Sequence, residues 1–215
     1  MINRPVIIIG AGGHARVLLD TLLSASYSVI GLTDIHPNKL LNPHLFFNIP
    51  LLGPDETIFH YPPDTIYLIN GLGMIPGPNF HHRRQIYQQF KACGYTFPAV
   101  VHPSAVLAAN VDINDGVQIM AGSVIQTGAV IGENTIVNTR VTIDHDAVIG
   151  SHVHLAPGTT ISGGVIIGCD TFVGAGSTII QGINIAEHCI VGAGSVVNRN
   201  VPEGARVMGV PARII

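Results

Sequence analysis

The chain has 215 residues, of which 47% are hydrophobic, 11% charged and 6% aromatic, so it is too apolar for a disordered protein and too weakly charged for a coiled coil. Its formal net charge is -3, with 10 Lys and Arg against 13 Asp and Glu, so we expect no nucleic-acid partner. The three cysteines form no CxxC pattern, which argues against a disulfide framework or a structural zinc site.

The first expected elements are a strand, a glycine turn, a helix and a second strand. The apolar run in MINRPVIIIG is too short for a signal sequence or a membrane span, so we expect a cytoplasmic protein without one. Val6–Ile9 predicts a strand, GAGGHA at residues 10–15 predicts a turn, and the apolar spacing from Val17 to Leu22 predicts a helix. A second strand, Val29–Leu32, leads to Asp34. The result is a βαβ unit with G-x-G-x-x-A and an acidic residue about twenty positions later, as in dinucleotide-binding proteins.

The glycine turn suggests a phosphate ligand. A turn of this kind directs backbone N–H groups and the positive end of the helix dipole toward an anion. A βαβ turn with no ligand is the alternative. The domain has only one mononucleotide-sized half, so a nucleotide with one ribose and a diphosphate fits better than NAD, with Asp34 accepting hydrogen bonds from the ribose or the base.

The remainder of the first 102 residues continues as an α/β domain. Its expected elements are a Pro- and Asn-rich stretch at 36–54, a strand at 65–69, the turn Asn70-Gly71-Leu72-Gly73, a helix at 82–92 and a strand at 96–101. We place the domain boundary at His102-Pro103, where a different pattern begins.

That pattern is a six-residue repeat over residues 103 to 200. A large aliphatic residue occupies every sixth position from Leu107 to Val197, sixteen in all, and a small or β-branched residue lies two positions before each. Both series point to one face of a short strand, and the break after each predicts a corner. Three such strands per turn make a prism of about five turns. Gly132, Gly150 and Gly168 follow the large position, where we expect a corner to need permissive backbone.

The repeat resembles that of the hexapeptide-repeat acyltransferases, which implies a left-handed parallel β-helix. Further motifs extend the resemblance over the whole chain: GAGGHA, the NGLG turn, HPSA, DHD, VHLAPG and GVPAR. With them the chain is similar to sugar acyltransferases of the sialic acid O-acetyltransferase type, above all to UDP-4-amino-sugar N-acetyltransferases of bacillosamine synthesis. The resemblance implies a Rossmann-like nucleotide-sugar-binding domain at 1–102 and an acetyl-CoA-binding catalytic β-helix at 103–215. Acetyl-CoA is then the co-substrate, and no metal is implied.

The resemblance also implies roles for individual residues. His145 would be the base that removes the proton of the attacking amine, and Asp146 would strengthen it. His154 would contact acetyl-CoA. The resemblance also assigns Gly163, Ala175, Ala193 and Asn138 to acetyl-CoA. It assigns Gly12, Gly13, His14, Asp34 and Gly71 to the UDP-amino-sugar.

His145 and His154 are nine residues apart, half of an eighteen-residue turn, so in one protomer we expect them on opposite sides of the prism. They can share a site only between subunits, which predicts a homotrimer with three clefts. Three alternatives remain open: sugar O-acetylation with the same base, a zinc hydratase resembling γ-class carbonic anhydrases with His145, His152 and His154 as ligands, and a scaffold without catalysis.

Overall fold

The computed structural model describes residues 4–35, 48–77 and 79–215. Contacts divide the chain into two compact units. The first combines the residues up to Met74 with Asn79–Val100, and the second combines Val101–Ile215 with the short segment that begins at Ile75. Within the described ranges, no helix is long and apolar enough to cross a membrane.

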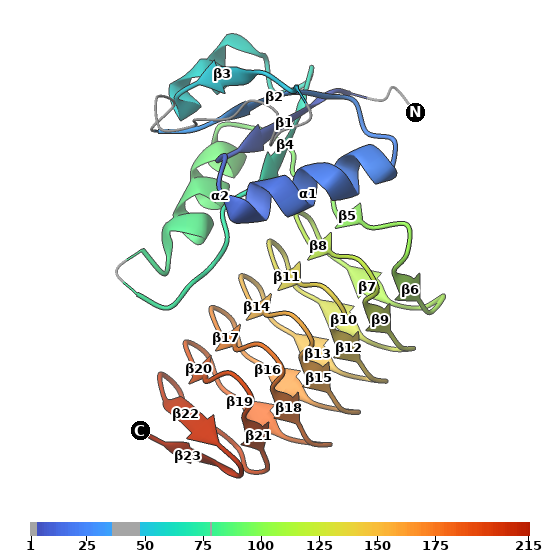
Figure 1. Cartoon of the computed structure of the whole chain (residues 1–215), viewed down its shortest axis with the longest axis vertical. Helices are drawn as coiled ribbons and strands as arrows, with labels where there is room; N and C mark the ends of the chain where they lie inside the picture. Colours follow the sequence, from blue (N-terminus) through green and yellow to red (C-terminus); the bar gives the residue numbers. More distant parts are fainter. Residues whose placement is uncertain (1–3, 36–47, 78) are drawn as a thin grey trace. The chain divides into compact units, whose positions relative to one another are not determined.

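The first unit is built on a four-stranded parallel sheet in the order β3-β2-β1-β4 (Figure 1). Strand β1 is completely buried because it has a neighbour on each edge and side chains packed over both faces, which explains its unbroken run of Val and Ile. The bounds are β1 Val6–Ile9, α1 Gly13–Ser24, β2 Val29–Thr33, β3 Leu51–Gly53, the 3₁₀ helix η3 Asp55–His60, β4 Tyr67–Asn70 and α2 His82–Ala92.

Helix α2 confirms the helix expected at residues 82–92 and supplies the aromatic part of the core. Tyr87 and Phe90 are buried, and the Tyr87 ring lies 4.8 Å from that of Phe97. The hydroxyl of Tyr95 donates hydrogen bonds to the carbonyls of Ile58 (3.1 Å) and Tyr61 (2.9 Å), so this buried phenol is satisfied. These contacts fix α2 against the sheet.

Two sequence predictions in this unit need correction. The strand expected at 96–101 is reduced to β5 (Val100–Val101), which joins a sheet of the second unit, while the Thr96 carbonyl accepts a bond from the Leu68 amide. The stretch at 36–54 contains strand β3, where the sequence showed only loop signals; its residues 36–47 lie outside the described residues. Three-residue strands carry too little periodicity to be recognised from sequence.

The second unit is a left-handed parallel β-helix. Each strand pairs with the strands three before and three after it, as β12 does with β9 and β15 through Thr142 opposite Val124 and Thr160. One coil therefore takes eighteen residues, as the repeat predicted. Sixteen two-residue strands form the coils: β6 Val106–Leu107, β7 Asp112–Ile113, β8 Gln118–Ile119, β9 Val124–Ile125, β10 Val130–Ile131, β11 Ile136–Val137, β12 Thr142–Ile143, β13 Val148–Ile149, β14 His154–Leu155, β15 Thr160–Ile161, β16 Ile166–Ile167, β17 Phe172–Val173, β18 Thr178–Ile179, β19 Asn184–Ile185, β20 Ile190–Val191 and β21 Val196–Val197.

The two inward series fill the prism as expected. The large aliphatic side chains are buried from Ile119 to Val197, and only the first two, Leu107 and Ile113, are partly exposed. Polar members of the small series donate to corner carbonyls of the next coil, for example Thr135 to Gly150 and Ser177 to Gly192, both at 2.9 Å. These bonds allow Ser and Thr to occupy the interior without loss of a hydrogen bond.

The explanation that the sequence suggested for the corner glycines is wrong. Positive φ occurs at the third residue after the large aliphatics from Ile113 to Val191, not at the first; at the first position, Gly132, Gly150 and Gly168 leave room for the next coil. A Cβ on Gly168 would lie 2.5 Å from the Glu187 amide nitrogen. The positive-φ positions of fourteen successive corners are Gly116, Gly122, Gly128, Asn134, Arg140, Asp146, His152, Gly158, Gly164, Asp170, Gly176, Gly182, His188 and Gly194.

Replacement of Gly168 by alanine should therefore destabilise the solenoid by about 2 kcal/mol, because the new methyl group meets backbone that cannot move alone. Gly163→Ala is the matched control: this glycine also lacks a positive φ, but its Cβ would meet only the end of a side chain. Urea unfolding of both variants measures the difference. Equal midpoints for the two variants would contradict the close-approach explanation.

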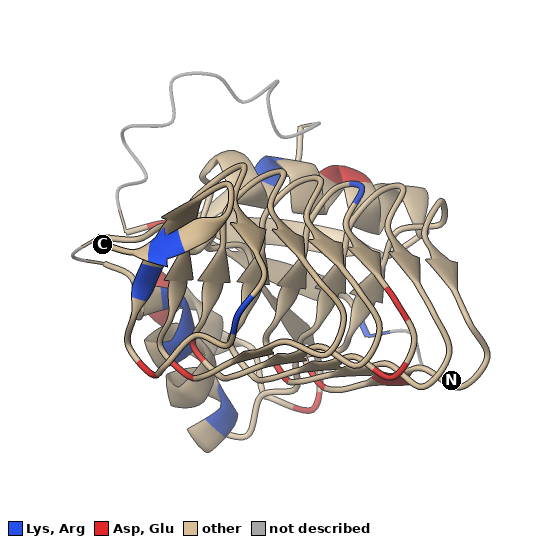
Figure 2. Cartoon of the chain, turned by 90° about the horizontal axis from the view of Figure 1, so that it is seen from below, with Lys and Arg blue, Asp and Glu red and all other residues tan. Residues whose placement is uncertain are grey.

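The solenoid ends in an antiparallel hairpin of β22 (Arg206–Gly209) and β23 (Ala212–Ile214), with β22 paired in parallel to β20. Basic side chains lie on these strands, whereas charged side chains are sparse along most other solenoid strands (Figure 2).

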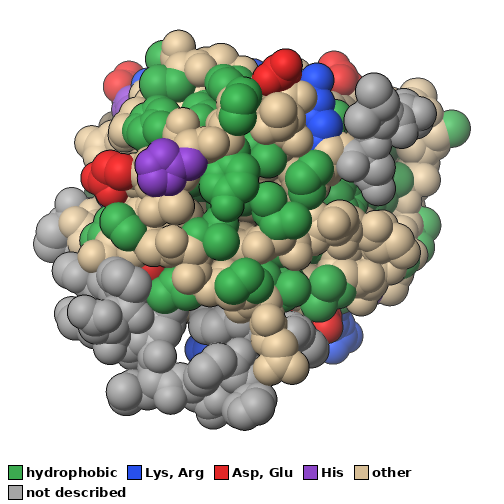
Figure 3. Space-filling model, turned by 90° about the horizontal axis from the view of Figure 1, so that it is seen from above, with side chains coloured by type: hydrophobic (Ala, Val, Ile, Leu, Met, Phe, Trp, Pro, Cys, Tyr) green, Lys and Arg blue, Asp and Glu red, His purple; other side chains and the backbone are tan. Residues whose placement is uncertain are grey.

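On the face seen in Figure 3, hydrophobic and uncharged side chains cover most of the described surface, with few basic ones between them.

Candidate functional site

The first candidate group lies on a corner column of the β-helix that we call the His145 column: residues 126–128, 144–146 and 162–164, stacked in successive coils. Stacking is held by backbone bonds from the Asp146 amide to the Thr127 carbonyl (3.1 Å) and from the Gly164 amide to the His145 carbonyl (2.9 Å). The Asp144 carboxylate also accepts a bond from the His145 amide at 2.7 Å. The corner backbone around His145 is thus fixed on three sides.

His145 and Asp146 form a hydrogen-bonded pair. The Nδ1 atom of His145 lies 2.8 Å from Oδ2 of Asp146, and the two side chains are 49% and 72% exposed. A carboxylate can only accept, so Nδ1 carries the proton and Nε2 is the basic atom. The hydrogen bond that His145 donates to Asp146 and the charge of Asp144 raise the pKa of His145 above its ordinary value. The arrangement is that of a base oriented by a carboxylate.

Two glycines make room for this pair. A Cβ on Gly163 would lie 2.5 Å from Nε2 of His145, so the imidazole rests directly over the glycine backbone. A Cβ on Gly128 would lie 2.5 Å from Oδ1 of Asp146. Asp146 itself has φ +58°, which Asp tolerates better than most residues. The sequence identified Gly163 as a candidate but offered no signal for Gly128.

Asp146→Asn should move the acid limb of the pH–rate profile to lower pH. A histidine that acts as a base must be neutral to accept a proton, and a raised pKa keeps His145 protonated to higher pH; loss of the carboxylate lowers that pKa again. Asparagine also tolerates the left-handed backbone, so the corner should be retained. The profile of kcat/KM against pH measures the shift, and an unchanged acid limb would mean that another group sets it.

The second group lies on what we call the Asn138 column: residues 138–140, 156–158, 174–176 and 192–194, together with the adjoining strand residue His154. Asn138 Nδ2 lies 3.2 Å from Nε2 of His154, and the His154 ring packs edge-on against Phe172 at 5.3 Å between centroids. Ala175 and Ala193 stack one coil apart, with the Gly194 amide donating to the Ala175 carbonyl at 2.8 Å. The structure therefore places Asn138, His154, Ala175 and Ala193 along one edge of the prism.

The two columns are separate within one protomer. They flank the same six-stranded sheet, β21-β18-β15-β12-β9-β6, one before its strands and one after them. His145 thus lies at the corner that follows the strands of this sheet, and His154 lies next to the corner that precedes them. This separation across the prism is the one that the nine-residue spacing predicted. A site that uses both histidines needs two protomers.

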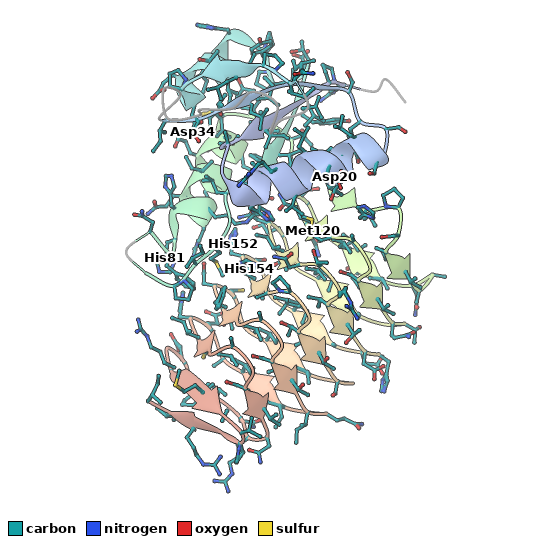
Figure 4. The ribbon with its side chains drawn as sticks, viewed as in Figure 1. Asp20, Asp34, His81, Met120, His152 and His154 are labelled. Carbon is teal, nitrogen blue, oxygen red and sulfur yellow. The ribbon has the colours of Figure 1, made fainter. Side chains whose placement is uncertain are left out.

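His152 lies on the third corner, next to His154 but not in either column (Figure 4). It is buried, has φ +58°, and its Nδ1 is 3.0 Å from Nδ2 of Asn134. The three histidines considered as zinc ligands therefore do not converge within a protomer. Among the described residues, no group of three His, Cys, Asp or Glu is placed to hold a metal.

The first unit carries the remaining candidates at the carboxyl edge of its sheet. Gly12 is the N-cap of α1 and Gly13 its first residue; both are exposed, and a Cβ on Gly12 would meet nothing. The carboxylate of Asp34, labelled in Figure 4, accepts a hydrogen bond from the Ala11 amide at 3.0 Å. The acidic residue after β2 thus orders the glycine turn after β1.

His14, in the first turn of α1, and Gly71 lie at the same edge. Gly71 belongs to a second turn, residues 70–73, which begins at the last residue of β4. A Cβ on Gly73 would lie 3.6 Å from that of His14. Gly71 is buried, and a Cβ there would lie 2.7 Å from the Ile9 carbonyl. What Gly71 provides in this structure is close packing of the second turn against β1 and α1.

Two protein-family models match the chain, one in each half. The family model of the PglD N-terminal domain matches residues 5–90, and that of the bacterial transferase hexapeptide (six repeats) matches residues 128–163. No curated protein sequence matches the chain.

Solved structures match over almost the full length. A mutant of perosamine N-acetyltransferase from Caulobacter crescentus, in complex with CoA and GDP-perosamine, is 32% identical with a TM-score of 0.89, over 98% of this chain and 96% of that one. The acetyltransferase domain of PglB from Neisseria gonorrhoeae, in complex with acetyl coenzyme A, is 29% identical with a TM-score of 0.90, over 99% and 100%. WeeI from Acinetobacter baumannii, at 24% identity and a TM-score of 0.86, shares the fold over 99% and 100%. The chain therefore belongs to the hexapeptide-repeat sugar acyltransferases that carry a PglD-type N-terminal domain.

Proposed function

We propose that the protein transfers an acetyl group from acetyl-CoA to the 4-amine of a nucleoside-diphosphate-linked 4-amino-4,6-dideoxy sugar. The observation that carries the proposal is the His145–Asp146 pair, whose Nε2 is available at an exposed corner. Support comes from the acetyltransferases of the same fold, whose structures contain CoA with GDP-perosamine or acetyl coenzyme A. The sequence resemblance favours a UDP-linked sugar, and the Caulobacter enzyme favours a GDP-linked one.

In the proposed mechanism, His145 Nε2 accepts a proton from the amine as its nitrogen bonds to the thioester carbonyl carbon. Asp146 holds the Nδ1 proton and stabilises the imidazolium that results. The tetrahedral intermediate then collapses with loss of the CoA thiolate, which leaves an amide. The acetyl group arrives activated as a thioester, so no nucleophilic cysteine is needed.

The proposed site is formed between protomers of a homotrimer. The His145 column of one protomer would supply the base, and the Asn138 column of the next, with His154, Ala175 and Ala193, would line the path of acetyl-CoA. The two columns flank one sheet, so a threefold rotation can bring one against the other around a closed ring. Light scattering of the purified protein tests this: a monomer would contradict the shared site.

The decisive experiment is CoA thiol release from acetyl-CoA with UDP- and GDP-linked 4-amino-4,6-dideoxy sugars, alongside free sialic acid. Turnover of an amino-sugar nucleotide establishes N-acetylation. Comparison of the UDP- and GDP-linked sugars identifies the nucleobase that the enzyme prefers. Turnover only with sialic acid would move the assignment to O-acetylation. Silence with every acceptor would contradict the proposed acceptor class.

A further inference from the structure

The sheet of the first unit has its reversal point between β1 and β4. Strands β2 and β3 lie on one side of β1 and β4 on the other, and in open parallel sheets ligands bind at the carboxyl ends of the strands at such a point. The turn at 10–13 and the turn at 70–73 meet there: a Cβ on Gly10 would lie 2.8 Å from Leu72 Cδ2. The two turns therefore pack closely against each other.

Arg83, in the first turn of α2, lies beneath the turn at 70–73. Its side chain is only 3% exposed, and its Nη1 atom donates to the carbonyls of Asn70 at 2.8 Å and Leu72 at 2.6 Å. Asn70 returns a bond from Nδ2 to the Arg83 carbonyl at 2.8 Å, and its Oδ1 accepts from the Leu72 amide at 3.2 Å. Arg83 and Asn70 thus clamp the turn from both sides.

The clamp has an electrostatic consequence for the crevice. Burial lowers the pKa of Arg83 to about 9, which still leaves the guanidinium charged at neutral pH. This positive charge faces two carbonyl oxygens whose partial negative charge would otherwise repel an anion at the turn. A buried charge is screened less by water than an exposed one, so its field extends to the neighbouring strand.

We propose that Arg83 is a positioning residue for the nucleotide: it locks the turn at 70–73 against the glycine turn and provides a fixed positive field for the diphosphate. The inference rests on the proposed function, because it assumes that the crevice takes a nucleoside diphosphate. The α1 N-terminus would contact the phosphates directly, and Arg83 would act on them through the turn.

The experiment is calorimetric titration of the full chain with UDP and GDP, with UMP and GMP, with uridine and guanosine, and separately with CoA. Arg83→Gln keeps a donor for the carbonyls but removes the charge. For the nucleotide whose base the wild type prefers, we expect the diphosphate to bind about tenfold more weakly, the monophosphate to lose less, and the nucleoside to change by less than about threefold. CoA binding should stay unchanged.

Two further variants complete the test. Arg83→Lys keeps the charge and should bind the diphosphate within about threefold of the wild type. Lys91→Met, which removes a cation from the last turn of the same helix, is the matched control and should change nothing. If Arg83→Gln does not fold, Arg83→Lys decides: a large loss of diphosphate binding in a folded Arg83→Lys variant would overturn the proposal.

The outcomes separate the inference from the function on which it rests. Equal losses for nucleoside, monophosphate and diphosphate would reduce Arg83 to a structural role and overturn the proposal. Undiminished diphosphate binding in folded Arg83→Gln would do the same while leaving the proposed function intact. A wild-type protein that binds neither nucleoside diphosphate would contradict both.

Discussion

His145→Ala is expected to lower kcat by roughly a hundredfold to ten-thousandfold, the range that a general base contributes. The reason is that Nε2 of His145 is oriented by Asp146 and that the column holds no second histidine: the residues stacked around it are Thr127 and Gly163. The measurement is single-turnover acetyl transfer, with CoA binding followed in parallel. CoA affinity should remain within a factor of about three, because His154, Ala175 and Ala193, which would line the path of the donor, belong to the other column.

The matched control for this variant is His188→Ala, which removes an exposed imidazole from a corner outside both columns. It should retain full activity. If His145→Ala transferred acetyl at the wild-type rate, the base would have to be sought elsewhere and the role of the pair abandoned.

Gly163→Ala is expected to reduce kcat about a hundredfold while leaving the stability of the β-helix almost unchanged. The added methyl group would lie 2.5 Å from Nε2 of His145, so the imidazole must swing away from its place over the glycine. Displacement of a catalytic group by about 1 Å can cost a factor of this size. The backbone has room for the change, because Ala175 and Ala193 already occupy the equivalent corner position of the other column.

The double variant Gly163→Ala with His145→Ala tests the reason for this effect. If the methyl group acts only by moving the imidazole, the double variant should be no slower than His145→Ala alone. Multiplicative losses would show that Gly163 contributes to transfer independently of His145, for example by contacting the donor itself.

Much of the fold was predictable because the β-helix repeats one simple pattern. Small and large interior residues lie two positions apart and recur every six residues, which does not fit the 3.6-residue period of a helix. Sixteen repeats of this pattern leave little ambiguity about the fold. The corners were harder: glycine after the large aliphatic suggested positive φ, whereas the structure shows close approach of the next coil, a contact between residues eighteen apart. A single-residue preference cannot reveal a contact of that kind.

In the candidate site, the residues with reactive side chains were recognisable and their supporting residues were not. His145 and Asp146 are adjacent in sequence, so their pairing could be anticipated. Gly128 supports Asp146 from one coil away, and Arg83 supports the turn at 70–73 from the next helix. An arginine in a polar helix gives no sequence signal of being buried, because its environment depends on how α2 packs.

The closing hairpin bears on how the protein avoids self-association through its sheets. A stack of parallel strands presents a row of unpaired amides and carbonyls at its end, which could template further strands from another molecule. In the eight-stranded sheet, β23 runs antiparallel to β22 and carries Arg213, so a further parallel coil would meet a strand of the opposite direction. The repeat that makes the β-helix easy to extend thus ends in a strand that works against fibre-like, end-to-end growth.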